Sequence, residues 1–160
     1  MTKEQGPSAE SLPGTVLVSP EDIRRIIQDG DAETLVNSAE RMGRRLVEGN
    51  VARHEVLAIH GDIWRIEMAW TASPTEAERR LRMLKPKLVH LAKTAKETAD
   101  GEDTLPVEEL MAMMCQALDV VLEQAGEAEE PDTARRRAFE RFASFFEATV
   151  AYHRYHGGRD

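Results

Sequence analysis

The segment DTARRRAFERFASFFEATVAYHRYHGG, residues 132–158, decides the fold, because it holds all four phenylalanines of the chain. Its apolar residues recur at steps of three and four, which is the period of an α-helix. They cover one broad face, formed by Ala138, Phe139, Phe142, Phe145, Phe146, Thr149, Val150 and Tyr152. A helix with so broad an apolar face is expected at the centre of a bundle. The glycine pair at 157–158 predicts its end.

Five further segments have the start and stop signals of helices. They run from Ser19 to Gly30, from Asp31 to Gly49, from about Arg53 to Trp70, from Ser73 to about Ala95, and from about Pro106 to Ala125. Serine or aspartate precedes several of them as a capping residue, and proline often occupies the first helical position. No segment alternates with period two. The sequence therefore predicts an all-α fold, a compact helical bundle of five to six helices in one domain, residues 19–160, after a mobile N-terminal segment, residues 1–18.

Two residues interrupt helices in which they are expected. Gly61 lies inside the predicted helix 53–70, costs about 1 kcal/mol relative to alanine, and predicts a close helix crossing. Pro86 lies inside the leucine seam of the next helix, where it removes one backbone hydrogen bond. We therefore expect a kink near residues 82–84.

Composition excludes several classes of protein. The single cysteine excludes an intramolecular disulfide and a zinc site made of several cysteines. The longest apolar run, residues 110–115, is too short to cross a bilayer, and residues 1–11 have no signal-peptide pattern. These features predict a soluble, cytoplasmic protein without a membrane partner. The net charge is −8, but residues 100–134 hold eleven acidic and no basic residues, so the rest of the chain is slightly basic.

The residues that could carry chemistry form no recognisable catalytic pattern. His54 and His60 are six residues apart, which places them on different faces of a helix, and His153 with His156 lacks a third ligand. Cys115 lies in the run MAMMC and is interpreted as a small core residue. Phosphate-binding loops and nucleophile elbows are also missing. We expect no metal, no cofactor and no enzymatic activity.

Basic residues give the more specific signal. On an ideal helix, Arg79, Arg82, Lys85 and Lys93 lie opposite the leucine seam, and few acidic residues interrupt them. A solvated helix face usually mixes charges, so this arc favours contacts with phosphates. The alternative is a solvated surface without a ligand. Arg44–Arg45 is a weaker basic cluster, and Arg154 lies between Tyr152 and Tyr155, aromatic residues that could stack on bases.

Three segments resemble the small subunit of type III-A CRISPR effector (Csm) complexes. Residues 84–88, LKPKL, followed by Lys93, are similar to that family's LKPKLAY…R signature. Residues 146–158, FEATVAYHRYHGG, resemble its C-terminal EAIVAYHKYYGG, and residues 39–46, AERMGRRL, are similar to its AEKIGKEL. The order and spacing of all three agree over roughly residues 35–159. One step departs, because residues 54–57 read HEVL where the family carries Thr/Ser-Gln-hydrophobic-Arg, and Arg53 is the nearest basic residue.

The resemblance implies a non-catalytic helical subunit that stacks in several copies along guide RNA and target RNA. It also implies the backbone subunits, the large polymerase-like subunit and copies of the chain itself as partners. We expect RNA contacts from Arg44, Arg45, Arg53, Arg79, Arg82, Lys85, Lys87, Lys93 and Arg154. The acidic region 100–134 could meet the basic face of the next copy. The competing hypothesis is a helical adaptor or self-associating bundle that binds only proteins.

Overall fold

The computed structural model describes residues 18–48, 53–98, 105–124 and 130–157. The described residues form six helices: α2 (Pro20–Ile27), α3 (Ala32–Glu48), α4 (Arg53–Ala72), α5 (Pro74–Thr98), α6 (Leu105–Glu123) and α7 (Pro131–Tyr155). They contain no strand, so the predicted all-α fold is confirmed. The predicted mobile segment lies outside the described residues except for Val18, which is buried.

Local signals set the helix ends. The backbone N–H of Asp22 donates to Ser19 Oγ at 3.0 Å, and that of Thr34 donates to Asp31 Oδ1 at 3.1 Å. At the start of α5, the N–H of Glu76 donates to Ser73 Oγ at 3.3 Å. These bonds satisfy N–H groups that have no partner inside the first turn. Gly30, which follows α2, has a positive φ of 70°, a conformation that glycine adopts without strain.

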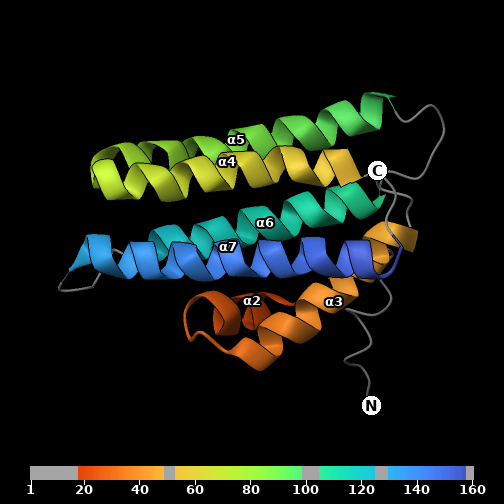
Figure 1. Ribbon diagram of the computed structural model, residues 1–160, viewed down its shortest axis with the longest axis horizontal. Coiled ribbons are helices and arrows are strands. Elements are labelled where there is room, and N and C mark those ends of the chain that lie inside the picture. The colour runs from red at the N-terminus through yellow and green to blue at the C-terminus, as the bar shows by residue number, and fades with distance from the viewer. Residues whose placement is uncertain (1–17, 49–52, 99–104, 125–129, 158–160) are drawn as a thin grey trace, which may run out of the picture.

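The helices are stacked in three layers (Figure 1). α4 lies beside α5, α6 lies beside α7, and α2 with α3 covers the opposite side of α6 and α7. The predicted central helix is central in the structure, because α7 contacts α2, α3, α4 and α6. Its broad apolar face is therefore used on several sides at once.

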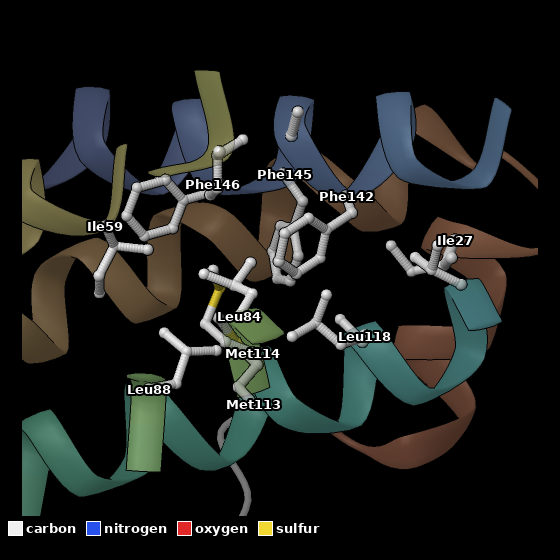
Figure 2. Packing of buried hydrophobic residues seen from close by; sticks show 14 of the residues in the cluster. Ile27, Ile59, Leu84, Leu88, Met113, Met114, Leu118, Phe142, Phe145 and Phe146 are labelled. Carbon is white, nitrogen blue, oxygen red and sulfur yellow. The ribbon is translucent and has the colours of Figure 1, made fainter. Parts of the chain in front are cut away.

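The core is one continuous hydrophobic cluster. Figure 2 shows Phe142, Phe145 and Phe146 of α7 directed into the space between the layers, where labelled side chains come from α4, α5 and α6. All three phenylalanine side chains are fully buried. Each contributes about 1.5–3 kcal/mol through the removal of apolar surface from water. These residues were predicted as the core, and that prediction is confirmed.

Two glycines within helices have different surroundings. A Cβ atom added to Gly43 of α3 would lie 2.7 Å from the backbone nitrogen of His153 and 2.7 Å from Cβ of Tyr152, both in α7. At Gly61 of α4 the nearest atom would be Nη1 of Arg65, at 3.7 Å. The close helix crossing is therefore at Gly43, and the crossing predicted at Gly61 does not exist among the described residues.

Pro86 does not end its helix. α5 continues through this residue from Pro74 to Thr98. The kink predicted near residues 82–84 stays a prediction.

Candidate functional site

The basic residues of α5 point to two different sides. α5 packs between α4 and α6. Lys85 Nζ donates to Asp119 Oδ1 of α6 at 3.0 Å, whereas Lys87 Nζ donates to Asp62 Oδ1 of α4 at 3.4 Å. Lys85, which belongs to the predicted arc, therefore faces α6, whereas Lys87, which does not belong to it, faces α4.

A groove of about 380 Å³ runs between α4 and α5. Its polar lining includes Asp62 and Arg65 from α4 and Arg79, Arg80 and Lys87 from α5. Met83 adds an exposed apolar side chain to the same groove. Arg79 and Lys87 were predicted as contact residues and lie here, while Arg65 and Arg80 were not in that set.

Ion pairs hold the groove side chains in place. Arg79 donates to both carboxylate oxygens of Glu76, at 3.1 and 2.8 Å, and Arg80 Nε donates to Glu76 Oε2 at 2.9 Å. Arg65 shares Asp62 with Lys87, at 3.2 Å. The hydrogen bond from Arg79 is the main cause that lowers the pKa of Glu76. Four cations thus face two carboxylates, which leaves a net charge of +2 for an anionic ligand.

The cations on the opposite side of α5 also form ion pairs within the chain. The hydrogen bond with Asp119 raises the pKa of Lys85, which keeps this ammonium group charged. Arg82 Nε donates to Glu78 at 3.0 Å, and the buried Arg135 of α7 donates to the same carboxylate at 2.6 Å. The Lys85–Asp119 and Arg135–Glu78 pairs connect α5 to α6 and α7, whereas the Arg82–Glu78 pair lies within α5.

Acidic residues of α6, which belong to the acidic region 100–134, also form ion pairs within the chain. Glu109, Asp119 and Glu123 pair with Arg45, Lys85 and Arg24 of the same chain. The Arg45–Glu109 pair is largely buried and measures 2.7 Å, so Arg45 connects α3 to α6. Burial raises the pKa of the Cys115 thiol, which favours its protonated form.

A second basic surface forms where α3 crosses α7. His156 Nε2 lies 3.6 Å from Glu40, which also pairs with Arg44 at 3.4 Å. Tyr155 is 79% exposed and makes an edge contact with the His156 ring, with centroids 5.1 Å apart. Arg154 is exposed beside them. The crossing joins the segments AERMGRRL and VAYHRYHGG, which are far apart in the chain.

The remaining predicted residues have simpler surroundings. Lys93 and Arg154 are exposed and form no ion pair with a residue in the described part of the chain. The side chain of Arg53 lies outside the described residues, although its backbone begins α4. Within the described ranges, no group of three histidine, cysteine, aspartate or glutamate residues could hold a metal ion, and no helix could span a membrane.

The fold and these surfaces define a class: a small helical bundle that presents cationic side chains from rigid helices, one set of them in an open groove. The chain matches the family described as Csm2 Type III-A over residues 29–159, most of its length, and therefore belongs to that family. This membership makes it a small subunit of a type III-A CRISPR (Csm) complex and implies association with other Csm subunits. No curated protein and no solved structure matches the chain.

Proposed function

We propose that this chain is a non-catalytic RNA-contacting subunit that lies in several copies along the guide RNA and target RNA of its complex. The groove between α4 and α5 is the main phosphate-binding surface. The observation that carries this proposal is the convergence of Arg65, Arg79, Arg80 and Lys87 on one open groove. Arginine is suited to this role because its planar guanidinium group can donate two parallel hydrogen bonds to a phosphate.

The groove cations outnumber the carboxylates that pair with them, which favours the groove as the phosphate-binding surface. Phosphates compete with Glu76 and Asp62 for the groove cations, and these ion pairs are exposed to solvent. Exposed ion pairs contribute little stability, so they can be exchanged for phosphate contacts at small cost. Lys85 and Arg82 lie on the other side of α5, beside α6 and α7. Arg44, Arg154 and exposed Lys93 supply further contacts outside the groove.

Binding without base reading fits a subunit that repeats along an RNA. Helical side chains that contact phosphates fix the position of the protein but carry no sequence information. The exposed Tyr155 ring can add stacking on an unpaired base, which is also sequence-tolerant. The backbone subunits and the large polymerase-like subunit are the proposed protein partners, and the cytoplasm is the proposed compartment.

The test is binding of single-stranded RNA by the full chain over a salt series. Wild type should bind weakly and without sequence preference, and binding should weaken as salt rises. The variant Arg65→Gln/Lys87→Gln should lower the slope of log K against log salt by about 0.7 per lost contact. The matched control, Arg24→Gln/Arg25→Gln, removes two charges from α2, on the far side of the bundle from α4 and α5 (Figure 1).

Equal binding by the wild type and the groove variant would show that the groove is not the RNA surface. If wild type binds no RNA even at low salt, the competing hypothesis holds, and the bundle contacts only proteins. Assembly with the other Csm subunits separates these outcomes from a folding defect, because a folded adaptor would still join the complex.

A further inference from the structure

Two exposed apolar side chains of α4 lie beside its seam with α7. Trp64 and Met68 are 56% and 54% exposed, and they are four residues apart, so they are neighbours on the helix surface. His60, one turn before Trp64, contacts Phe146 of α7, with ring centroids 6.4 Å apart. Single exposed apolar residues need no explanation, whereas adjacent ones mark an interaction surface.

Carboxylates gather on the same seam. Glu67 of α4 is three residues after Trp64. Burial is the main cause that raises the pKa of Glu67, and the negative charges of Glu147 and Glu140 on α7 raise it further. Glu147 lies 4.0 Å from His60, which is charged only when protonated. Three carboxylates therefore lie close enough to one another to repel.

Two of these carboxylates have no arginine or lysine partner in the described ranges. Glu140 pairs with Arg136 at 3.8 Å, but Glu67 and Glu147 form no such pair. The carboxylates beside the groove, by contrast, each pair with two cations. α4 thus offers cations on the side of α5 and uncompensated carboxylates on the side of α7.

The chemistry of these groups selects an arginine side chain. A guanidinium group is attracted to the face of an aromatic ring, and tryptophan is the best ring for this contact. The same planar group donates paired hydrogen bonds to a carboxylate. Glu67 and Glu147 repel a phosphate, so the surface suits a protein ligand rather than RNA.

We propose that Trp64, Met68, Glu67 and Glu147 form a docking site for an arginine-bearing segment of a partner protein. One arginine of the segment stacks on Trp64 and pairs with Glu67, which is within reach because the two residues are one turn apart. Apolar side chains of the segment pack on Met68. At about 100° per residue, Trp64 lies about 160° around α4 from Asp62 of the groove, so RNA and the segment do not compete.

Nuclear magnetic resonance tests this site without RNA, because the chain has only two tryptophans. The probe is a helical peptide of arginine, leucine and alanine. The indole N–H peak of Trp64 should move on titration, whereas that of Trp70, which is 4% exposed, should stay. A peptide with citrulline in place of arginine loses the charge but keeps the shape, and should bind about tenfold more weakly. Movement of both peaks, or equal binding of the two peptides, would overturn the proposal.

Variants separate the site from a general effect of charge, with binding measured by fluorescence polarisation and folding by circular dichroism. Trp64→Leu keeps an apolar side chain but loses the aromatic face, and should weaken the arginine peptide about threefold. Glu67→Gln/Glu147→Gln should weaken it by about three- to tenfold. The matched control, Glu21→Gln/Glu33→Gln, removes two exposed carboxylates from α2 and α3 and should bind like wild type. Equal losses in both double variants would contradict a specific site.

The same variants identify other occupants of this surface. Single-stranded RNA should bind Glu67→Gln/Glu147→Gln at least as well as wild type, because two repulsive charges are removed. A Trp64→Leu variant that loses RNA but keeps the peptide would assign the surface to RNA. A Trp64 peak that moves with protein concentration alone would assign it to a second copy of the chain. Either result would overturn the proposal.

Discussion

Gly43 of α3 lies directly against the backbone of His153 in α7, so closely that a Cβ atom at position 43 would be 2.7 Å from the His153 nitrogen. The obstacle is backbone rather than a flexible side chain, so it cannot move aside without shifting a helix. Two of the segments that carry the family resemblance, residues 39–46 and 146–158, meet at this crossing. Both segments are therefore needed to form this close contact between α3 and α7.

Substitutions at the two helical glycines should have opposite effects. Gly43→Ala should destabilise the protein by about 1–3 kcal/mol, because the added methyl group overpacks the crossing of α3 and α7. Gly61→Ala should stabilise it by roughly 0.5–1 kcal/mol, since its Cβ meets only the end of the Arg65 side chain at an ordinary contact distance of 3.7 Å and helix propensity improves. Chemical denaturation of both variants measures the difference. Equal effects of the two substitutions would contradict the assignment of the close crossing to Gly43.

Removal of one central aromatic ring should be costly. Phe142→Ala should lower the free energy of unfolding by about 3–5 kcal/mol, because the side chain is fully buried between the layers and leaves a cavity. Tyr155→Ala is the control, and its effect should stay within about 0.5 kcal/mol because that ring is exposed. A loss below about 1 kcal/mol for Phe142→Ala would mean that α7 is not the centre of the bundle.

Two lysines only two residues apart should have different roles. Lys87→Glu places a negative charge in the groove and should weaken binding of single-stranded RNA and lower its salt slope by about 0.7. Lys85→Glu should leave the slope unchanged, because Lys85 points to Asp119 on α6. Binding isotherms at several salt concentrations compare them. Equal losses in both variants would show that the whole of α5, rather than the groove, attracts RNA.

The N-cap of α3 should give a pH-dependent contribution to stability. The hydrogen bond from the Thr34 backbone is the main cause that lowers the pKa of Asp31 below its usual value of 3.8. The charged carboxylate is thus favoured in the folded state. Its stabilising effect is complete above pH 3.8 and is lost as the pH falls through the lowered value.

Asp31→Asn therefore serves as the test of that contribution. The variant keeps a capping oxygen but has no carboxylate to titrate. It should be less stable than wild type at neutral pH, and the difference should shrink in acid. Urea denaturation at several pH values measures it. A difference that stays constant down to strongly acidic pH would exclude the ionised cap as its cause.

The chain alone should leave RNA and DNA intact, with or without divalent metal ions. His153, one of the two closely spaced C-terminal histidines, is fully buried at the crossing of α3 and α7 and cannot reach a substrate. Gel analysis after long incubation measures the outcome. Cleavage that disappears in a folded His153→Ala variant would contradict the proposed non-catalytic role.

The helices and the core could be predicted from local patterns. The capping side chains of Ser19, Asp31 and Ser73 accept hydrogen bonds from residues three positions later, so the sequence already contains both partners. The burial of Phe142 and Leu84 follows from apolar spacing along one helix in the same way. The family resemblance depended on contiguous segments, which are also local.

The grouping of charges could not be predicted from one helix at a time. Arg65 is 14 residues from Arg79 along the chain, and only the packing of α4 against α5 puts both in one groove. The periodicity of α5 placed Lys85 among the outward cations, but the partner of each lysine depends on which helix lies beside it.

The sequence by itself determined the helices, their ends, the apolar faces and the family, because each of these depends on residues within a few turns of one another. Only the tertiary structure decided that Gly43 marks the close crossing while Gly61 faces outward, and that Arg65 joins the groove cations. The physical reason is that spacing gives the face of a helix on which a side chain lies. The neighbour of that face depends on how separate helices pack.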